Sequence, residues 1–320
     1  MKNLDPKRAR WIRIRMGILC GMMGLGLGAI VSRRSDTVAA LPLPVDVRTL
    51  VIDDALQDGP APDRSPAASA PPTDASFIVY TSGSTGNPKG IVLSQRAVLH
   101  RARQLVNAVH LAPDDKVLSL ASPSTIGGLQ QIFEVMLSGA TLVKLDLQRM
   151  GLGTVLQVIG ERRLTMMFST PAVWRSIAGI ENAASALATL RCIQSSGDAL
   201  LEIDLQLLRQ VLPGNCHLLS VYGATEAPAL LQWFVSSKVP SDGPRVPTGY
   251  PLPGFAFALL DESGNVVEEG EPGELVIKSS WMSLGIWRNG AVHPGPFEQD
   301  SGDQSAPVYR TGDIARRRPD

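Results

Sequence analysis

The sequence predicts an α/β fold in which a parallel sheet is followed by a small antiparallel β subdomain. From Ser94 to Ala188, short apolar strand candidates alternate with helical segments, which is the pattern of βαβ units with parallel strands. From Thr248 onward, strand candidates are separated by turn-like stretches, and no long helix is predicted. Residues 57–74, rich in Pro, Ala, Ser and Asp, precede both regions and are typical of a linker or loop.

Apolar and β-branched runs define the individual elements. Strands are expected at residues 49–52, 77–80, 91–93, 117–120, 140–143, 165–168, 190–194, 217–221, 255–261 and 275–278. Helices are expected from the N-cap Ser94 through Val106, around residues 132–137 and 154–162, and from Pro171, which suits a first helical position. Trp174, Phe133 and Phe168 are interpreted as core residues.

Composition restricts the function classes. The 320 residues are enough for one large domain or two ordinary domains. The formal net charge is zero and charged residues make up 19%, so no broad basic footprint indicates nucleic-acid binding. Cys20, Cys192 and Cys216 are too scattered for a disulfide framework or a metal site, and a reduced intracellular setting is favoured. The four histidines show no metal-ligand spacing and are given no role.

The most informative stretch is Tyr80–Gly90, with the sequence Tyr-Thr-Ser-Gly-Ser-Thr-Gly-Asn-Pro-Lys-Gly. It lies between two strand candidates, which argues against a flexible linker. Glycines let backbone N–H groups approach anionic oxygens, hydroxyls donate further hydrogen bonds, and Lys89 supplies a positive charge. These features predict a phosphate-binding loop. It is not a Walker A loop, because Lys89 is followed by Gly90 and a strand, and the Rossmann glycine spacing does not fit.

Four motifs in order resemble those of the adenylate-forming, or AMP-binding, superfamily, which includes acyl-CoA synthetases, luciferases and adenylation domains of nonribosomal peptide synthetases. They are Tyr80–Gly90, Val221-Tyr222-Gly223-Ala224-Thr225-Glu226, Gly273–Ile277 with Gly285-Ile286-Trp287, and Tyr309-Arg310-Thr311-Gly312-Asp313. The resemblance extends from Ser76 to the C-terminus and is closest to a peptide-synthetase adenylation domain. It implies a distorted, barrel-like β subdomain, so that the chain resembles an incomplete adenylate-forming N-terminal domain.

The resemblance also implies ATP-dependent activation of a carboxylate, giving an acyl-adenylate and pyrophosphate, with Mg²⁺. It assigns the β- and γ-phosphates to Thr81, Ser82, Gly83, Ser84, Thr85, Gly86 and Lys89. Thr225 is assigned to the α-phosphate, Glu226 to Mg²⁺ and Asp313 to the ribose hydroxyls. Tyr222, followed by Gly223, is placed against the adenine. Ser196, Gly197, Asp198 and Ala199 are expected to line the nucleotide and acyl pockets.

Two departures from the family pattern affect the expected substrate. Ala224 stands where adenylation domains usually carry proline, which is tolerable. Residues 122–128 contain no carboxylate, whereas peptide-synthetase domains place an aspartate there to pair with the substrate α-amino group. Because a buried ammonium needs a counter-charge, an ordinary α-amino acid is disfavoured. A carboxylic acid without that amine, or an amine recognised elsewhere, is expected. A carrier protein or the CoA thiol is the implied acceptor.

A further departure is the expected absence of the family's hinge and C-terminal domain, which supplies a lysine during adenylation. We therefore expect a truncated chain with four parts: residues 1–35, residues 36–75 as a partial first subdomain and linker, residues 76–245 as the nucleotide-binding subdomain, and residues 246–320 as the β subdomain ending at the hinge. Two functions stay open. One is an enzyme that uses a separate C-terminal subdomain, and the other is a catalytically inactive ATP- or AMP-binding module.

The N-terminal segment allows two interpretations. Residues 1–15 are basic and residues 16–31 are apolar and glycine-rich, which resembles a signal peptide or a short membrane anchor. The alternative is a remnant of the family's first subdomain or an aberrant start. We favour the second, because adenylate chemistry needs cytosolic ATP, and we expect a cytoplasmic protein.

Overall fold

The computed structural model describes residues 75–81, 88–228, 230–235, 243–298 and 306–319, together with the backbone of residues 29–32 and 48–51. The chain divides into two units, Met1–Ser76 and Phe77–Asp320. In the first unit, strand β1 (Ala29–Ser32) pairs in parallel with β2 (Arg48–Val51). The candidate anchor at residues 16–31 lies outside the described residues except for its last three, which belong to β1. No helix among the described residues is both long and apolar enough to cross a membrane.

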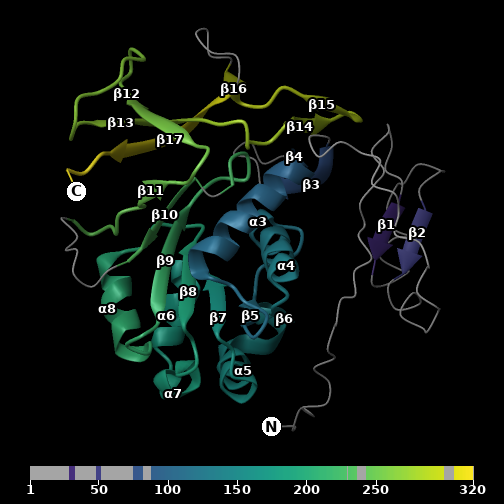
Figure 1. Ribbon diagram of the computed structural model, residues 1–320, viewed down its shortest axis with the longest axis vertical. Coiled ribbons are helices and arrows are strands. Elements are labelled where there is room, and N and C mark those ends of the chain that lie inside the picture. Colours follow the sequence, from purple (N-terminus) through teal and green to yellow (C-terminus); the bar gives the residue numbers. More distant parts are fainter. Residues whose placement is uncertain are drawn as a thin grey trace. The chain divides into compact units, whose positions relative to one another are not determined.

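The second unit is built on a seven-stranded sheet in the order β11-β10-β9-β8-β7-β5-β6 (Figure 1). Five neighbouring strands, in the spatial order β6-β5-β7-β8-β9, are parallel. Strands β10 and β11 continue the sheet in antiparallel fashion. The strands are β5 (Lys116–Ser119), β6 (Thr141–Lys144), β7 (Met166–Ser169), β8 (Cys192–Ser196), β9 (His217–Tyr222), β10 (Leu231–Phe234) and β11 (Tyr250–Pro251). The predicted parallel sheet is confirmed.

Helices cover both faces of this sheet because successive strand residues point to opposite sides. In β8, Cys192 packs with residues of α3 and α4, whereas the next residue, Ile193, packs with residues of α5 to α8. The helices are α3 (Gln95–Val109), α4 (Ile126–Ser138), α5 (Leu147–Arg162), α6 (Pro171–Ala178), α7 (Ala183–Leu187) and α8 (Glu202–Val211). The alternating strands and helices therefore form two layers of helix around one sheet.

Local sequence signals explain where several helices begin. The Ser94 hydroxyl accepts a hydrogen bond from the Ala97 amide at 3.1 Å, so Ser94 is the N-cap of α3 as predicted. Pro171 opens α6, and Trp174 in that helix is fully buried. Helix α4 begins six residues earlier than expected at residue 132, because Thr125 caps it by accepting a hydrogen bond from the Gly128 amide.

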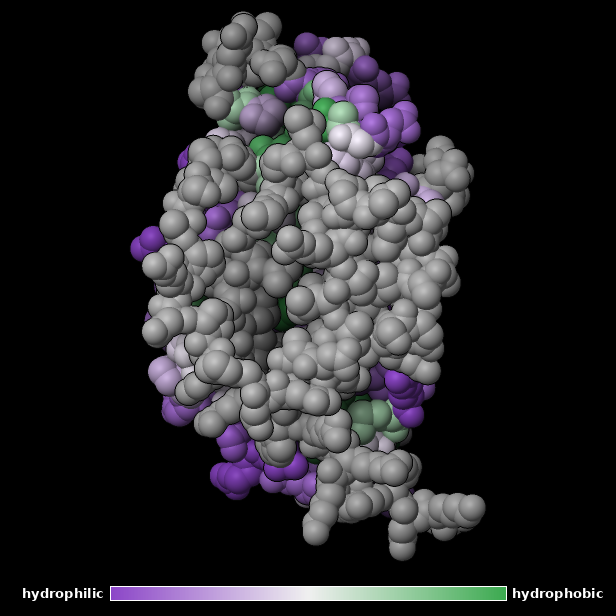
Figure 2. Space-filling view, turned by 90° about the vertical axis from the view of Figure 1, so that its right-hand side faces the viewer, coloured by the Kyte–Doolittle hydropathy of each residue, from purple (hydrophilic) through white to green (hydrophobic). Residues whose placement is uncertain are grey.

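The remaining strands form two four-stranded sheets, ordered β12-β13-β17-β16 and β15-β14-β4-β3. Their bounds are β12 (Ala256–Leu260), β13 (Pro272–Lys278), β16 (Phe297–Glu298), β17 (Val308–Arg316), β3 (Ala75–Thr81), β4 (Lys89–Ser94), β14 (Gly285–Arg288) and β15 (Ala291–His293). The pairs from β12 onward are antiparallel, which confirms the predicted β subdomain. In Figure 2 the coloured residues at the lower end of the view are mainly hydrophilic, and apolar residues appear among polar ones near the top, where Figure 1 places these sheets.

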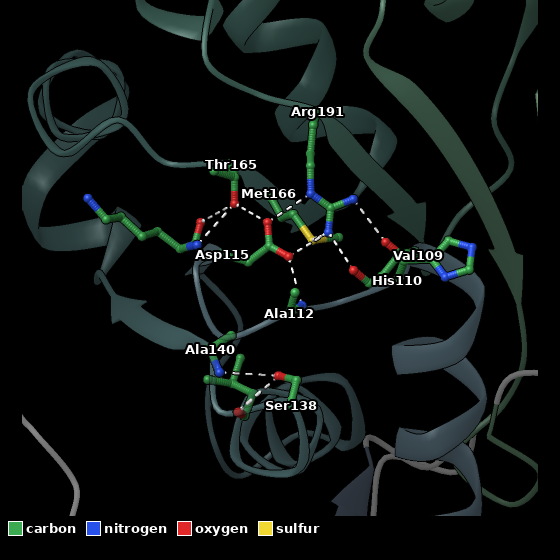
Figure 3. A network of polar contacts seen from close by, with 11 residues as sticks. Val109, His110, Ala112, Asp115, Ser138, Ala140, Thr165, Met166 and Arg191 are labelled. Atoms are coloured by element: carbon green, nitrogen blue, oxygen red, sulfur yellow. Dashed lines mark hydrogen bonds and ion pairs between the residues drawn. The ribbon is translucent and has the colours of Figure 1, made fainter.

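A polar network joins the amino ends of β5, β7 and β8 (Figure 3). The Asp115 carboxylate accepts hydrogen bonds from Arg191 Nε at 2.8 Å, from the Thr165 hydroxyl at 2.7 Å and from the Ala112 amide at 2.9 Å. Arg191 also donates to the carbonyls of Val109 and His110 at the end of α3. The network lies at the edge of the sheet opposite to the carboxyl ends of the strands, so we interpret it as structural.

Candidate nucleotide-binding site

Two predicted site segments leave neighbouring strands at the same edge of the sheet. Strands β8 and β9 run in parallel with Ser196 opposite Val221, and they end at Ser196 and Tyr222. The segment from Ser196 to Ala199 therefore starts beside the segment from Tyr222 to Glu226. The carboxyl ends of parallel strands are the usual ligand-binding edge of such sheets.

The segment after β8 is a tight turn that exposes its backbone. Gly197 has φ = +88°, a conformation that favours glycine, and the Asp198 carboxylate accepts a hydrogen bond from the Ala199 amide at 2.7 Å. Residues 197–199 are exposed. The turn passes close to Thr170, at the end of β7, because a Cβ added at Gly197 would lie 3.6 Å from the Thr170 methyl carbon. The turn can thus line a ligand at this edge.

The segment after β9 is closed by backbone hydrogen bonds. The Ala224 amide donates to the Ala227 carbonyl at 3.1 Å, and the Leu230 amide donates to the Tyr222 carbonyl at 2.7 Å. Ala227 is fully buried and anchors the turn in an apolar cluster shared with the β subdomain. Thr225 and Glu226, by contrast, are half-buried at the turn. The loop therefore holds these two side chains where the seven-stranded sheet meets the sheet that contains β12, β13 and β17.

The β subdomain brings Asp313 to this junction. Asp313 lies in β17, and its carboxylate accepts a short hydrogen bond from the Tyr222 hydroxyl. Two residues 91 positions apart, both predicted from motifs, are thus in direct contact. Tyr309 lies in the same strand, and burial, followed by the charges of Glu226 and Asp313, raises the pKa of Tyr309 to about 12.

Support for Asp313 comes from the neighbouring strand β13. The Glu274 carboxylate pairs with Arg310 and accepts a hydrogen bond from the Gly312 amide at 3.2 Å. The Thr311 hydroxyl donates to the Leu275 carbonyl at 2.8 Å and accepts from the Asp313 amide at 3.1 Å. Glu274, Arg310 and Thr311 fall within the predicted motifs, which assign them no role. Their place in those motifs is the sequence signal for them.

The structure describes only the two ends of the predicted phosphate-binding loop. Thr81 ends β3 and Lys89 begins β4, and both are half-buried, whereas Ser82, Gly83, Ser84, Thr85 and Gly86 lie outside the described residues. Backbone hydrogen bonds link β4 to the Glu226 turn. The Ser283 amide donates to the Glu226 carbonyl, and the next amide, of Leu284, donates to the Val92 carbonyl, both at 2.8 Å. Within the described residues, no hydrogen bond or ion pair links the Lys89 or Thr225 side chain to another predicted site residue.

The candidate site contains charged side chains of both signs. Glu226 and Asp313 are carboxylates, which accept hydrogen bonds from hydroxyls or bind cations, and Lys89 is a cation suited to phosphate. Within the described ranges, no three His, Cys, Asp or Glu side chains gather as a metal-binding group. A single carboxylate is compatible with Mg²⁺, which usually keeps several waters and is completed by phosphate oxygens.

A protein-family model and a curated protein are both similar to this chain. The family model "AMP-binding enzyme" matches residues 29–287. Bacitracin synthase 1 from Bacillus licheniformis is 31% identical over 250 residues, which are 77% of this chain but only 5% of that protein. This chain thus spans a small part of the length of that relative.

Two solved structures show the same fold. The NpsA N-terminal subdomain of Klebsiella oxytoca, in complex with 3-hydroxybenzoyl-AMSN, is 22% identical, with a TM-score of 0.72 over 90% of this chain and 71% of that one. The nonribosomal peptide synthetase FmoA3, in its AMPPNP-bound form, is also 22% identical, with a TM-score of 0.78 over 90% of this chain and 31% of that one. The family model spans more than half of the sequence, so the resemblance to this family is confirmed: this chain belongs to the AMP-binding enzyme family.

Proposed function

We propose that this chain binds ATP with Mg²⁺ and activates a carboxylic acid as its acyl-adenylate. The observation that carries the proposal is the contact between Tyr222 and Asp313, which brings two nucleotide motifs together at the carboxyl edge of the sheet. In this proposal Asp313 accepts the ribose hydroxyls and Tyr222 lies against the adenine. The turn from Ser196 to Ala199 lines the adjoining pocket.

The phosphates are assigned to the other side of the site. Lys89 and Thr81, with the loop between them, contact the β- and γ-phosphates, and Thr225 contacts the α-phosphate. Glu226 holds Mg²⁺, which supplies neutralisation of the phosphate charge. The hydrogen bonds through Ser283 and Leu284 support this assignment, because they hold β4 and the Glu226 turn in a common framework.

The chemistry requires positioning and charge neutralisation. A substrate carboxylate oxygen attacks the α-phosphorus, the bond between the α-phosphorus and the bridging oxygen breaks, and pyrophosphate leaves with the electron pair. A carboxylic acid is already ionised at neutral pH, so no general base is needed. The residues of the site act by holding the reactants in line and by neutralising charge that develops on the phosphates.

The substrate is proposed to be an acid without an α-ammonium group near α4. Residues 122–128 lead into that helix and form its first turn, where the Thr125 hydroxyl donates to the Ser122 carbonyl at 2.8 Å and no side chain carries a negative charge. A desolvated ammonium at this position would have no counter-charge from the segment. The thiol sulfur of a carrier protein or CoA then attacks the acyl carbon, with the help of a C-terminal adenylation subdomain. The bond between that carbon and the AMP phosphate oxygen breaks, AMP leaves with the electron pair, and the thiol proton passes to solvent.

The test is carboxylate-dependent exchange of pyrophosphate into ATP, measured across a panel of acids with Mg²⁺ and paired with an ATP-binding titration. Lys89→Ala is expected to abolish exchange. Lys116→Ala makes the same change at the amino end of β5, away from the candidate site, and is expected to preserve exchange. Binding without exchange would favour the alternative of an inactive nucleotide-binding module. A folded chain that neither binds ATP nor exchanges pyrophosphate would contradict both functions.

A further inference from the structure

The hydrogen bond between Tyr222 and Asp313 has a direction that matters for nucleotide recognition. A phenol hydroxyl donates one hydrogen, and an ionised carboxylate only accepts. Tyr222 therefore occupies one oxygen of Asp313, Oδ2, and leaves Oδ1 as an acceptor. Asp313 is exposed, and no ion pair with a cation is found for it within the described residues. Its second oxygen is available to a ligand.

The Asp313 main chain is held independently of Tyr222. Gly312, with φ = +76°, allows the bend that precedes Asp313, and Glu274 fixes the Gly312 amide. The Asp313 amide is itself bonded to the Thr311 hydroxyl. These contacts place the Cα atom of Asp313, but they leave rotation about its side-chain bonds unrestricted. The Tyr222 hydroxyl is the contact that orients the carboxylate.

Tyr222 is well suited to this task. Its ring packs at the edge of the apolar cluster that contains Ala227, Leu231 and Tyr309, so the hydroxyl position is fixed by packing. Burial, followed by the hydrogen bond to Asp313, raises the pKa of Tyr222 above its ordinary value. The hydroxyl consequently stays protonated and remains a donor over the physiological pH range.

We infer that Tyr222 is a positioning residue whose hydroxyl orients the Asp313 carboxylate so that the free oxygen selects ribonucleotides over deoxyribonucleotides. The inference rests on the proposed ATP site and adds a role for the Tyr222 hydroxyl, distinct from any contact of its ring with the base. An oriented acceptor gains a charge-assisted hydrogen bond with a ribose hydroxyl without first losing rotational freedom. A deoxyribose lacking that hydroxyl leaves the acceptor unpaired.

The test compares the dissociation constants of ATP, 2′-deoxyATP and 3′-deoxyATP by calorimetric titration. For the unaltered chain, we expect at least one deoxynucleotide to bind on the order of tenfold more weakly than ATP, the size of one charge-assisted hydrogen bond. Tyr222→Phe keeps the ring and removes only the hydroxyl, and it is expected to reduce this ratio to about twofold or less. Asp313→Asn should reduce it similarly, and Tyr250→Phe, the same change at an exposed tyrosine, should leave it unchanged.

The possible outcomes separate this inference from the proposed function. If the unaltered chain binds no ATP, the proposed function itself fails. If ATP binds but Tyr222→Phe retains the full ribose preference, the positioning role is wrong. Tighter ATP binding by Tyr222→Phe would also overturn it, because the hydroxyl would then compete with the ribose for Asp313. A circular-dichroism spectrum of each variant establishes that the fold is retained.

Discussion

Glu274 and Arg310 form an ion pair between β13 and β17, and the same Glu274 carboxylate accepts a hydrogen bond from the Gly312 amide. The pair joins two motifs 36 residues apart in the sequence. Strand β13 has a register shift between Glu274 and Val276, opposite the segment that carries Asp313. Glu274 thereby supports the backbone of a proposed nucleotide-binding residue without belonging to the site.

Glu274→Gln is expected to weaken ATP binding severalfold while lowering the free energy of unfolding by only about 1 kcal/mol. The stability effect is small because the Arg310 side chain is 37% exposed and its charge is partly screened by solvent. Titration calorimetry and urea denaturation measure the two effects. Glu271→Gln, an exposed neighbour in the preceding turn, is the matched control. Unchanged ATP affinity in a folded Glu274→Gln variant would show that the contacts of Glu274 with Arg310 and Gly312 are dispensable for ATP binding.

Asp115→Asn is expected to lower the free energy of unfolding by about 2–3 kcal/mol and to leave ATP affinity unchanged. Asp115 is buried, and removing its charge leaves the Arg191 guanidinium poorly compensated (Figure 3). Chemical denaturation measures the loss. Asp114→Asn makes the same change at the adjacent exposed residue and should have little effect. A large fall in ATP affinity would contradict the purely structural role.

The same carboxylate predicts sensitivity to acid. Burial by itself raises the pKa of Asp115, but hydrogen bonds from Arg191, the Ala112 amide and Thr165 outweigh it and lower the pKa overall. The stabilising contribution is therefore complete above the ordinary value of 3.8 and is lost as the pH falls through the lower folded value. The stability difference between the unaltered chain and Asp115→Asn should shrink in that range, as followed by denaturation at a series of pH values.

Glu134 in α4 predicts the opposite pH dependence. It is buried, and desolvation raises its pKa from 4.5 to about 8 despite the opposing charge of Arg101 on α3. Because the folded state holds this proton more tightly, the contribution is complete below pH 4.5 and is lost as the pH rises through about 8. Glu134→Gln should remove this part of the pH dependence of the unfolding midpoint. Glu181→Gln, at an exposed carboxylate, should retain it.

Two adjacent glycines at the start of α4 are predicted to respond oppositely to alanine. At Gly128 an added Cβ would lie 2.0 Å from the Ser122 carbonyl oxygen, so Gly128→Ala should destabilise the chain by about 1–3 kcal/mol. At Gly127 no atom of the described residues, apart from its chain neighbours and the backbone of its own helix, lies within 4 Å of that position, and Gly127→Ala should stabilise the helix by about 0.5–1 kcal/mol. Thermal unfolding of the two variants measures the difference. Equal effects would mean that the Ser122 carbonyl is not packed against the helix.

Local patterns predicted most elements but not all of their limits. The helix expected at residues 154–162 begins at Leu147 in the structure, and Gly151, with φ = +74°, interrupts it. Helix α8 was not predicted, although Asp204 closes a capping interaction by accepting from the Leu201 amide at 2.9 Å and Leu205 and Leu208 are buried. Such short helices depend on tertiary packing, because nucleating an isolated helix is unfavourable.

The sequence by itself determined the α/β class, the parallel strands, the antiparallel β subdomain and the motif residues of the candidate site. These depend on side-chain periodicity, capping and loop composition, which act between near neighbours in the chain. Only the tertiary structure decided that β5 lies between β6 and β7, that Asp115 pairs with Arg191, and that Tyr222 contacts Asp313. Those contacts join residues that are distant in sequence. Their formation is governed by the packing of whole elements against one another, which no local pattern encodes.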